Sequence, residues 1–199
     1  GIVRCALSWA CWKTYLGRAE TDQVRGMAMS VLGNGLGNAG FYEDALSVGE
    51  TDLSLRRRLG CREHIILAVQ ANLAVTYAAC GQRDKATRIE EDVYFAWRRL
   101  NGDQHRDTLI AANNYVASLK DLQRHEEAKS LLRKTLPVAR RILGESYETT
   151  LKMRWTYGQS LYMDDGATLD DLREAVETLE EIERTARRVF GGAHPVAAG

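Results

Sequence analysis

The sequence predicts an all-α protein, a solenoid in which pairs of antiparallel helices repeat along the chain. A glycine recurs every 42 residues, at Gly60, Gly102 and Gly144, each time after an arginine-rich run. Repeats of this length are typical of solenoids, in which each unit buries its apolar face against its neighbours. The chain has only two prolines and no sustained alternation of polar and apolar residues, which favours long helices and predicts no sheet.

About nine helices are expected, joined by short turns. Gly40 and Gly81 suit the left-handed residue that ends a helix, and Gln123 stands at the equivalent place in the third pair. The turn of the fourth pair, around Asp164, is about five residues longer. An alanine marks the start of the second helix of each pair, at Ala45, Ala86, Ala128 and Ala175. The expected helices lie near 3–16, 20–38, 42–58, 63–80, 83–100, 106–122, 125–142, 147–163 and 168–190.

The whole chain, 1–199, is expected to form one array. Because it starts with Gly1 rather than Met and opens inside a second helix, we interpret it as part of a longer chain whose targeting signals are lost. The expected units are a second helix at 2–16, full units at 17–60, 61–102, 103–144 and 145–191, and the start of a further unit at 192–199.

Composition excludes several classes of protein. Lys and Arg total 27 and balance 27 Asp and Glu, so no overall basic field favours nucleic acid. No stretch approaches 18 apolar residues, so no membrane span is expected. The cysteines show no C-x-x-C pair, which favours free thiols in an intracellular, reducing compartment. The cytoplasm is the favoured compartment, and an organelle is left open. The cysteines are Cys5, Cys11, Cys61 and Cys80.

The repeated phrases resemble the tetratricopeptide repeat (TPR), in the 42-residue form of kinesin light chains. The third unit carries the phrases that match this family: Asn113-Asn114-Tyr115, Glu126-Glu127-Ala128 and Leu143-Gly144. The second unit adds Asn72-Leu73-Ala74, and His194-Pro195 matches the opening of another unit. The resemblance implies a right-handed superhelix of antiparallel helix pairs. It also implies a binding task, because this repeat serves many unrelated partners.

In proteins of this family, the first helices of successive units line a concave face. Carrying its positions onto this sequence predicts a partner-binding surface that could hold an extended or short helical peptide through amide hydrogen bonds and aromatic anchors. For Trp155 and Tyr162, the alternative is packing between helices. The predicted partner-binding residues are Asn34, Asn38, Asn113, Lys120, Trp155, Gln159 and Tyr162.

Several motifs suggest chemistry that their context does not favour. The segment 35–40 fits the dinucleotide pattern G-x-G-x-x-G, but the repeat places it at the end of a helix, where we expect glycines to allow a close neighbour. His105-Arg106-Asp107 lies in a turn between units, with Asp107 or Thr108 capping the next helix. We interpret His125 and the run 90–92 as solvated helix surface, and the recurring arginines as partners for carboxylates of the next unit.

The sequence therefore predicts a non-enzymatic interaction module, a scaffold or adaptor that binds a protein or peptide partner on its concave face. The alternative is a structural or accessory subunit of a larger multiprotein assembly, contacting its neighbours through helix edges and the ends of the array. No catalytic residue, cofactor or metal site is predicted, because the histidines lack metal-ligand spacing and no nucleophile stands with a base.

Overall fold

A computed structural model describes residues 1–190, and in this range it contains nine helices and no strand. The predicted all-α solenoid is confirmed, and every predicted helix end lies within three residues of the observed one. The helices are α1 (Ile2–Tyr15), α2 (Gln23–Ala39), α3 (Tyr42–Arg58), α4 (Glu63–Ala79), α5 (Arg83–Asn101), α6 (Arg106–Asp121), α7 (His125–Ile142), α8 (Glu148–Tyr162) and α9 (Leu169–Phe190). The predicted end of the fourth unit at residue 191 and the predicted start of a further unit at 192–199, His194-Pro195 included, lie outside the described residues.

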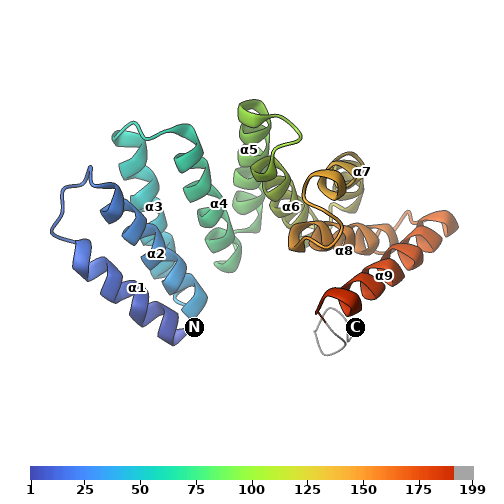
Figure 1. The fold of residues 1–199 in the computed structure, drawn as a ribbon, viewed down its shortest axis with the longest axis horizontal. Helices are drawn as coiled ribbons and strands as arrows, with labels where there is room; N and C mark the ends of the chain where they lie inside the picture. The colour runs from blue at the N-terminus through green and yellow to red at the C-terminus, as the bar shows by residue number, and fades with distance from the viewer. Residues whose placement is uncertain (191–199) are drawn as a thin grey trace. The chain divides into compact units, whose positions relative to one another are not determined.

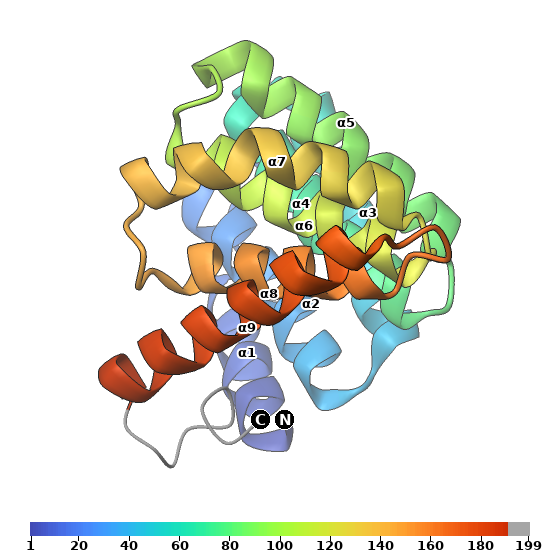
Figure 2. The same cartoon turned by 90° about the vertical axis from the view of Figure 1, so that its right-hand side faces the viewer.

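The chain forms two compact units, 1–93 and 94–199, and the boundary between them falls within α5. In the first unit, α1, α2, α3 and α4 follow one another as antiparallel helices, each packed on the next (Figure 1). In the second unit, α8 lies between α7 and α9, and α6 packs against both α7 and α8 (Figure 2). Each unit is therefore built from helix hairpins stacked on their sequence neighbours.

Small residues lie where these helices meet. The four marker alanines are all at most 2% exposed. At Gly33 an added Cβ would lie 3.5 Å from Val48 on α3, and at Gly158 it would lie 3.0 Å from Leu179 on α9. Large side chains at these positions would hold the paired helices apart.

The closest approach is at Gly35, within the predicted G-x-G-x-x-G segment. A Cβ there would lie 2.2 Å from the Oγ and 2.5 Å from the Cβ of Ser8 on α1. The segment belongs to a helix and not to the strand-to-helix turn that binds a dinucleotide. Gly35 therefore allows the close packing of α1 on α2, in line with the expectation of a close neighbour at these glycines.

The turns use the left-handed backbone conformation that the sequence predicted. Gly40 and Gly81 end their helices with φ of +88° and +79°. Gln123 adopts a φ of +60°, and it is the one residue other than glycine with a positive φ in the described part of the chain. A side chain in this conformation is strained, so the third hairpin has a turn with a less favourable residue.

Two helix starts differ from expectation. The second helix begins at Gln23 rather than near residue 20, because Asp22 caps it by accepting hydrogen bonds from the N–H groups of Val24 and Arg25. The prediction that Asp107 or Thr108 caps the sixth helix is wrong. The Nδ1 atom of His105 accepts the Asp107 N–H at 3.2 Å instead.

Candidate partner-binding surfaces

Trp155, Gln159 and Tyr162 lie along one face of α8, at successive turns of the helix. Trp155 is 42% exposed and Tyr162 is 44% exposed, while Tyr157 on another face of the same helix is buried. Gln159 is half-buried between them. Both predicted aromatic side chains are therefore available to a partner. The alternative, in which they are packed between helices, is not observed for these two residues.

The adjacent helix α6 supplies Asn113 and Lys120, both half-buried. The Nζ atom of Lys120 donates a hydrogen bond of 3.5 Å to the Oε1 atom of Gln159, which links the two first helices of the second unit. The structure thus brings together Lys120 and Gln159 from two repeats. Together with the exposed aromatic residues, they define what we call the α6–α8 surface: Asn113, Lys120, Trp155, Gln159 and Tyr162.

The remaining predicted residues, Asn34 and Asn38, lie on α2 in the first unit, and both are exposed. They are four residues apart, so they share one face of the helix. Five of the seven predicted residues therefore belong to one unit and two to the other.

A cavity of about 440 Å³ lies at the carboxyl ends of α6 and α8. Two of its residues, Lys120 and Gln159, belong to the predicted partner-binding set. The complete lining is Lys120, Asp121, Gln123, His125, Gln159, Met163, Asp164 and Asp165. Sequence reasoning did not foresee this cavity, because it needs the end of one repeat to meet the long turn of the next.

The interpretation of His125 as a solvated helix start is wrong. It is only 8% exposed, and its Nδ1 atom is buried without a hydrogen-bond partner. Next to it, Lys129 is also buried and pairs with Asp164 at 3.0 Å and with Glu126. The hydrogen bond from Lys129 lowers the pKa of Asp164. Burial alone would lower the pKa of Lys129, but its two carboxylate partners raise it. This pair is therefore ionised at neutral pH.

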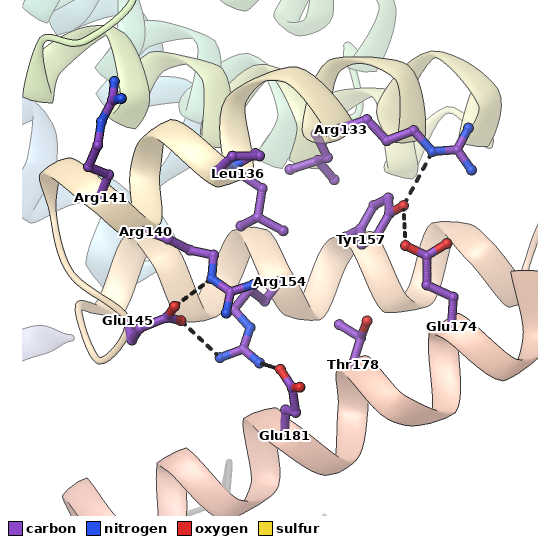
Figure 3. A pocket seen from close by; sticks show the side chains of 12 residues that line it. Arg133, Leu136, Arg140, Arg141, Glu145, Arg154, Tyr157, Glu174, Thr178 and Glu181 are labelled. Carbon is purple, nitrogen blue, oxygen red and sulfur yellow. Dashed lines mark hydrogen bonds and ion pairs between the residues drawn. The ribbon is translucent and has the colours of Figure 1, made fainter.

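A second cleft, of about 670 Å³, runs between α7 and α9 over α8, and sequence reasoning missed it as well (Figure 3). Arg154 lies at its base, 3% exposed, and its guanidinium contacts Glu145 at 3.5 Å and Glu181 at 2.6 Å. Figure 3 shows Arg154 reaching between these two carboxylates. Arg140 also pairs with Glu145, at 2.5 Å. The cleft is therefore crossed by ion pairs of its own.

Tyr157 adds a further bridge in this cleft. Its hydroxyl accepts a hydrogen bond of 3.3 Å from Arg133 on α7 and donates one of 2.8 Å to Glu174 on α9 (Figure 3). Burial raises the pKa of Tyr157, so the phenol stays protonated and can donate. The hydrogen bonds of Tyr157 thus join α7, α8 and α9. We assign this cleft to packing because Glu145 and Glu181 already pair with Arg140 and Arg154.

The arginines that close each repeat pair as the sequence predicted in two of the units. Arg98 contacts Asp103, and Arg140 contacts Glu145, each at 2.5 Å. In both pairs the carboxylate follows directly after the repeat glycine, at the start of the next unit. These ion pairs are about half exposed and contribute little stability each.

The acidic run at 90–92 is not uniformly solvated, which corrects its interpretation. Glu90 is 2% exposed, and its Oε2 atom has no hydrogen-bond partner. Burial raises the pKa of Glu90 to about 8. Because a buried carboxylate without a partner is costly, this residue is protonated at neutral pH.

The described residues contain no group of three His, Cys, Asp or Glu that could hold a metal ion. Within the same range, no helix has both the length and the hydropathy needed to cross a bilayer.

Comparison with known proteins identifies the repeat. Residues 66–107 and 108–146 match the family model described as a tetratricopeptide repeat. These segments are tetratricopeptide repeats. The first match begins inside α4 and the second ends just before α8, so together they include the third predicted hairpin with its Asn113, Lys120 and His125. The predicted resemblance to TPR proteins is confirmed.

Solved structures with a similar fold cover nearly the whole chain. One of them comes from Podosopora anserina and is a variant of the nearly identical TPR-like repeats of a protein described as a kinesin light chain. It is 18% identical, with a TM-score of 0.74, and the match covers 94% of this chain and 86% of that chain. BtubC (BKLC) from P. vanneervenii is 15% identical, with a TM-score of 0.67 and coverage of 98% and 86%.

Bacillus thuringiensis PlcR, solved with the peptide PapR7 and DNA, is 12% identical, with a TM-score of 0.71 and coverage of 96% and 68%. No curated protein matches this chain. At these identities the structural similarity shows the fold alone, a solenoid of helix hairpins.

Proposed function

We propose that this TPR chain is a non-enzymatic scaffold or adaptor that binds a protein partner through the α6–α8 surface. The observation that carries this proposal is the exposure of Trp155 and Tyr162 on one stripe of a first helix, beside the Lys120–Gln159 pair. Tryptophan and tyrosine are enriched among the residues that dominate binding energy at protein interfaces. Repeat solenoids use their first-helix surfaces in this way, as the family resemblance implies.

The chemistry of the surface fits an extended or short helical peptide. The two aromatic rings offer large apolar contact areas, and the amides of Asn113 and Gln159 can donate and accept hydrogen bonds with a peptide backbone. Lys120 is the one cation among these five residues, so a basic clamp for a terminal carboxylate is not the favoured mode.

Substitution of the aromatic residues tests the proposal. A partner is first identified by crosslinking and capture on the intact chain, and its affinity is then measured for Trp155→Ala and Tyr162→Ala. A residue that dominates binding contributes about 2 kcal/mol or more, so at least one variant should bind about 30-fold more weakly. Circular dichroism should remain that of the unsubstituted chain.

Leu172→Ala and Val176→Ala are matched controls, because both side chains are exposed and apolar but lie on the second helix α9. They should leave the affinity within about twofold. Unchanged affinity in both aromatic variants, or an equal loss in the controls, would contradict the proposal.

A second candidate, an accessory subunit of a larger assembly, has one observation in its favour. Helix α1 and the residue that follows it expose several large apolar side chains: Ile2, Val3, Leu7, Trp9 and Leu16. Such a face is suited to cover by a neighbouring chain. If this candidate holds, Trp9→Ala will disrupt co-purification with the neighbour and Trp155→Ala will not. The opposite pattern favours the scaffold.

A further inference from the structure

The first helices of the first unit, α2 and α4, each expose a stripe of five side chains, none of which is Lys, Arg, Asp or Glu. Within each stripe the residues are three or four apart, as expected for one face of a helix. The stripe on α2 consists of Val24, Met27, Val31, Asn34 and Asn38, and the stripe on α4 of His64, Ala68, Asn72, Val75 and Ala79. We call these ten residues the α2–α4 surface.

The two stripes are neighbours. Helix α2 contacts α4 directly. Asn34 from one stripe and Asn72 from the other line the same small cavity of about 20 Å³. Both helices lie within the first compact unit. The ten residues therefore form one surface.

The lack of charge distinguishes this surface from the rest of the chain. The chain is 27% charged, so about three of ten positions would carry a charge by composition alone, and exposed positions are usually richer in charge. The second helix α3 follows that rule, since its exposed residues include Glu43, Asp44, Glu50, Arg57 and Arg58. Depletion of charged residues is typical of the central part of protein interfaces. The α2–α4 surface is therefore suited to be covered by another molecule.

Aliphatic side chains give the surface its apolar area. Met27 is 64% exposed and Val75 is 62% exposed. A methionine side chain is flexible and polarizable, so it adapts to the side chains of a partner. Ala68 and Ala79 are small, so a partner can approach α4 closely. Covering these residues removes apolar area from water, which favours association.

The surface suits a helix better than an extended peptide. The N–H and C=O groups inside α2 and α4 bond within their own helices, and the side chains add three amides, at Asn34, Asn38 and Asn72. An extended peptide would bring one N–H and one C=O group per residue, and covered groups of this kind need partners. A helix satisfies its own backbone. The α4 stripe between Ala68 and Ala79 is about 17 Å long, which accommodates about three turns of a partner helix.

We propose that the α2–α4 surface receives a helix of the partner that presents an uncharged, aliphatic stripe. A charged side chain on that stripe would lose its water without meeting an opposite charge, which is costly. The three asparagines can pair with neutral polar side chains along the border of the stripe. The inference rests on the proposed function, and it names the kind of segment that the first unit binds.

Other kinds of partner fit less well. Anionic membranes and nucleic acids both attract Lys and Arg, and the ten positions contain neither. A charged peptide segment would find no residue of opposite charge among them. An uncharged helix is the partner that these residues favour.

The test uses two peptide probes that have the same length and differ in charge. Each is a fluorescent, amidated peptide of about fifteen residues with leucine at helical spacing. One probe has glutamine beside the leucine stripe, and the other has glutamate there. Fluorescence anisotropy on the intact chain should show saturable binding of the glutamine probe and about tenfold weaker binding of the glutamate probe. Equal affinities would overturn the assignment.

Substitutions to both charges at one position locate the site. Val75→Lys and Val75→Glu should each weaken the glutamine probe about tenfold, because a covering helix strips water from either charge. Met27→Lys and Met27→Glu repeat the test on α2. Circular dichroism should stay unchanged, since both side chains are exposed. Unchanged affinity at both positions would overturn the assignment.

Val176 on α9 provides the matched control, because it is 56% exposed. Val176→Lys and Val176→Glu should change the affinity of the glutamine probe less than twofold. An equal loss in these controls would place the probe elsewhere and overturn the assignment.

The same variants, measured with the partner captured on the intact chain, separate the possible occupants. Both charges at Val75 should weaken that partner. If lysine strengthens binding and glutamate weakens it, the occupant is an acidic segment and the assignment is wrong. If the chain alone forms dimers in light scattering and Val75→Lys dissociates them, the occupant is a second copy and the assignment is wrong.

These outcomes also separate this inference from the proposed function. If the captured partner depends on Trp155 or Tyr162 but not on Val75 or Met27, the uncharged helix is wrong and the α6–α8 surface stands. If the partner depends on Val75 and Met27 but on neither aromatic residue, the α2–α4 surface stands and the α6–α8 surface is wrong.

Discussion

Replacing Gly35 with alanine should weaken the packing of α1 on α2. The new Cβ would lie 2.2 Å from the Oγ and 2.5 Å from the Cβ of Ser8, whereas carbon atoms pack at about 3.5–4.0 Å. The Ser8 hydroxyl could rotate away by giving up its 2.7 Å bond to the Arg4 carbonyl. The Ser8 Cβ cannot, because it is fixed to the backbone of α1. The helix itself must move by about 1 Å.

Two opposing free energies set the size of this effect. Overpacking a close contact costs about 1–3 kcal/mol, and replacing glycine by alanine inside a helix gains about 1 kcal/mol. Gly37 on the same helix provides the matched control, because its added Cβ would meet nothing closer than the Ala45 Cβ at 3.9 Å. Gly37→Ala should therefore gain the whole stabilisation that alanine gives inside a helix. Gly35→Ala should be about 1–3 kcal/mol less stable than Gly37→Ala, because it also overpacks the contact with α1.

Urea unfolding followed by circular dichroism measures this difference, and the fluorescence of Trp9 and Trp12 reports on α1 directly. Ser8→Gly in the Gly35→Ala background should recover most of the loss, because it removes both clashing atoms. If Gly35→Ala is as stable as Gly37→Ala, or Ser8→Gly gives no recovery, then the close approach of α1 and α2 is not what requires glycine.

Four further substitutions test other features of the structure. Gln123→Gly should raise the free energy of unfolding by about 1 kcal/mol, because it relieves a positive φ, while Gly81→Gln should lower it by a similar amount; urea melts would check both. Glu90→Gln should flatten the dependence of stability on pH, because the pKa of Glu90 is raised to about 8 and the folded state keeps a proton that the unfolded state loses above about pH 4.5. Between about pH 4.5 and pH 8, the free energy of unfolding of the unsubstituted chain should fall by up to about 1.4 kcal/mol per pH unit. An unchanged slope in the variant would contradict the burial of this carboxyl. Glu181→Gln should cost about 1–3 kcal/mol by weakening the support of buried Arg154, whereas Glu177→Gln should cost almost nothing in the same urea melts.

The sequence predicted the helices well because the signals for them are local. Glycines with a positive φ, the marker alanines and the apolar spacing recur in each hairpin, and each acts on its immediate neighbours. The packing role of Gly35 followed from its place in the repeat, although the sequence could not identify Ser8 as its neighbour.

Features that join different repeats were not predicted. His125 and Glu90 carry charged or polar chemistry that normally indicates solvent, and their burial depends on helices distant in sequence. The cavity at the end of α6 needs the long turn after α8, and the Arg154 network needs carboxylates from the segments before α8 and in α9. Only three-dimensional packing brings such groups together.

Site-specific photo-crosslinking tests the central claim most directly, that the first helices of these stacked hairpins form the surface on which a partner binds. A benzophenone amino acid is placed at Trp155 in one preparation and at Val176, which is similarly exposed on the second helix α9, in another. A surface on the first helices predicts efficient crosslinks to the partner from position 155 and few from 176. Crosslinks mainly from 176 would contradict it.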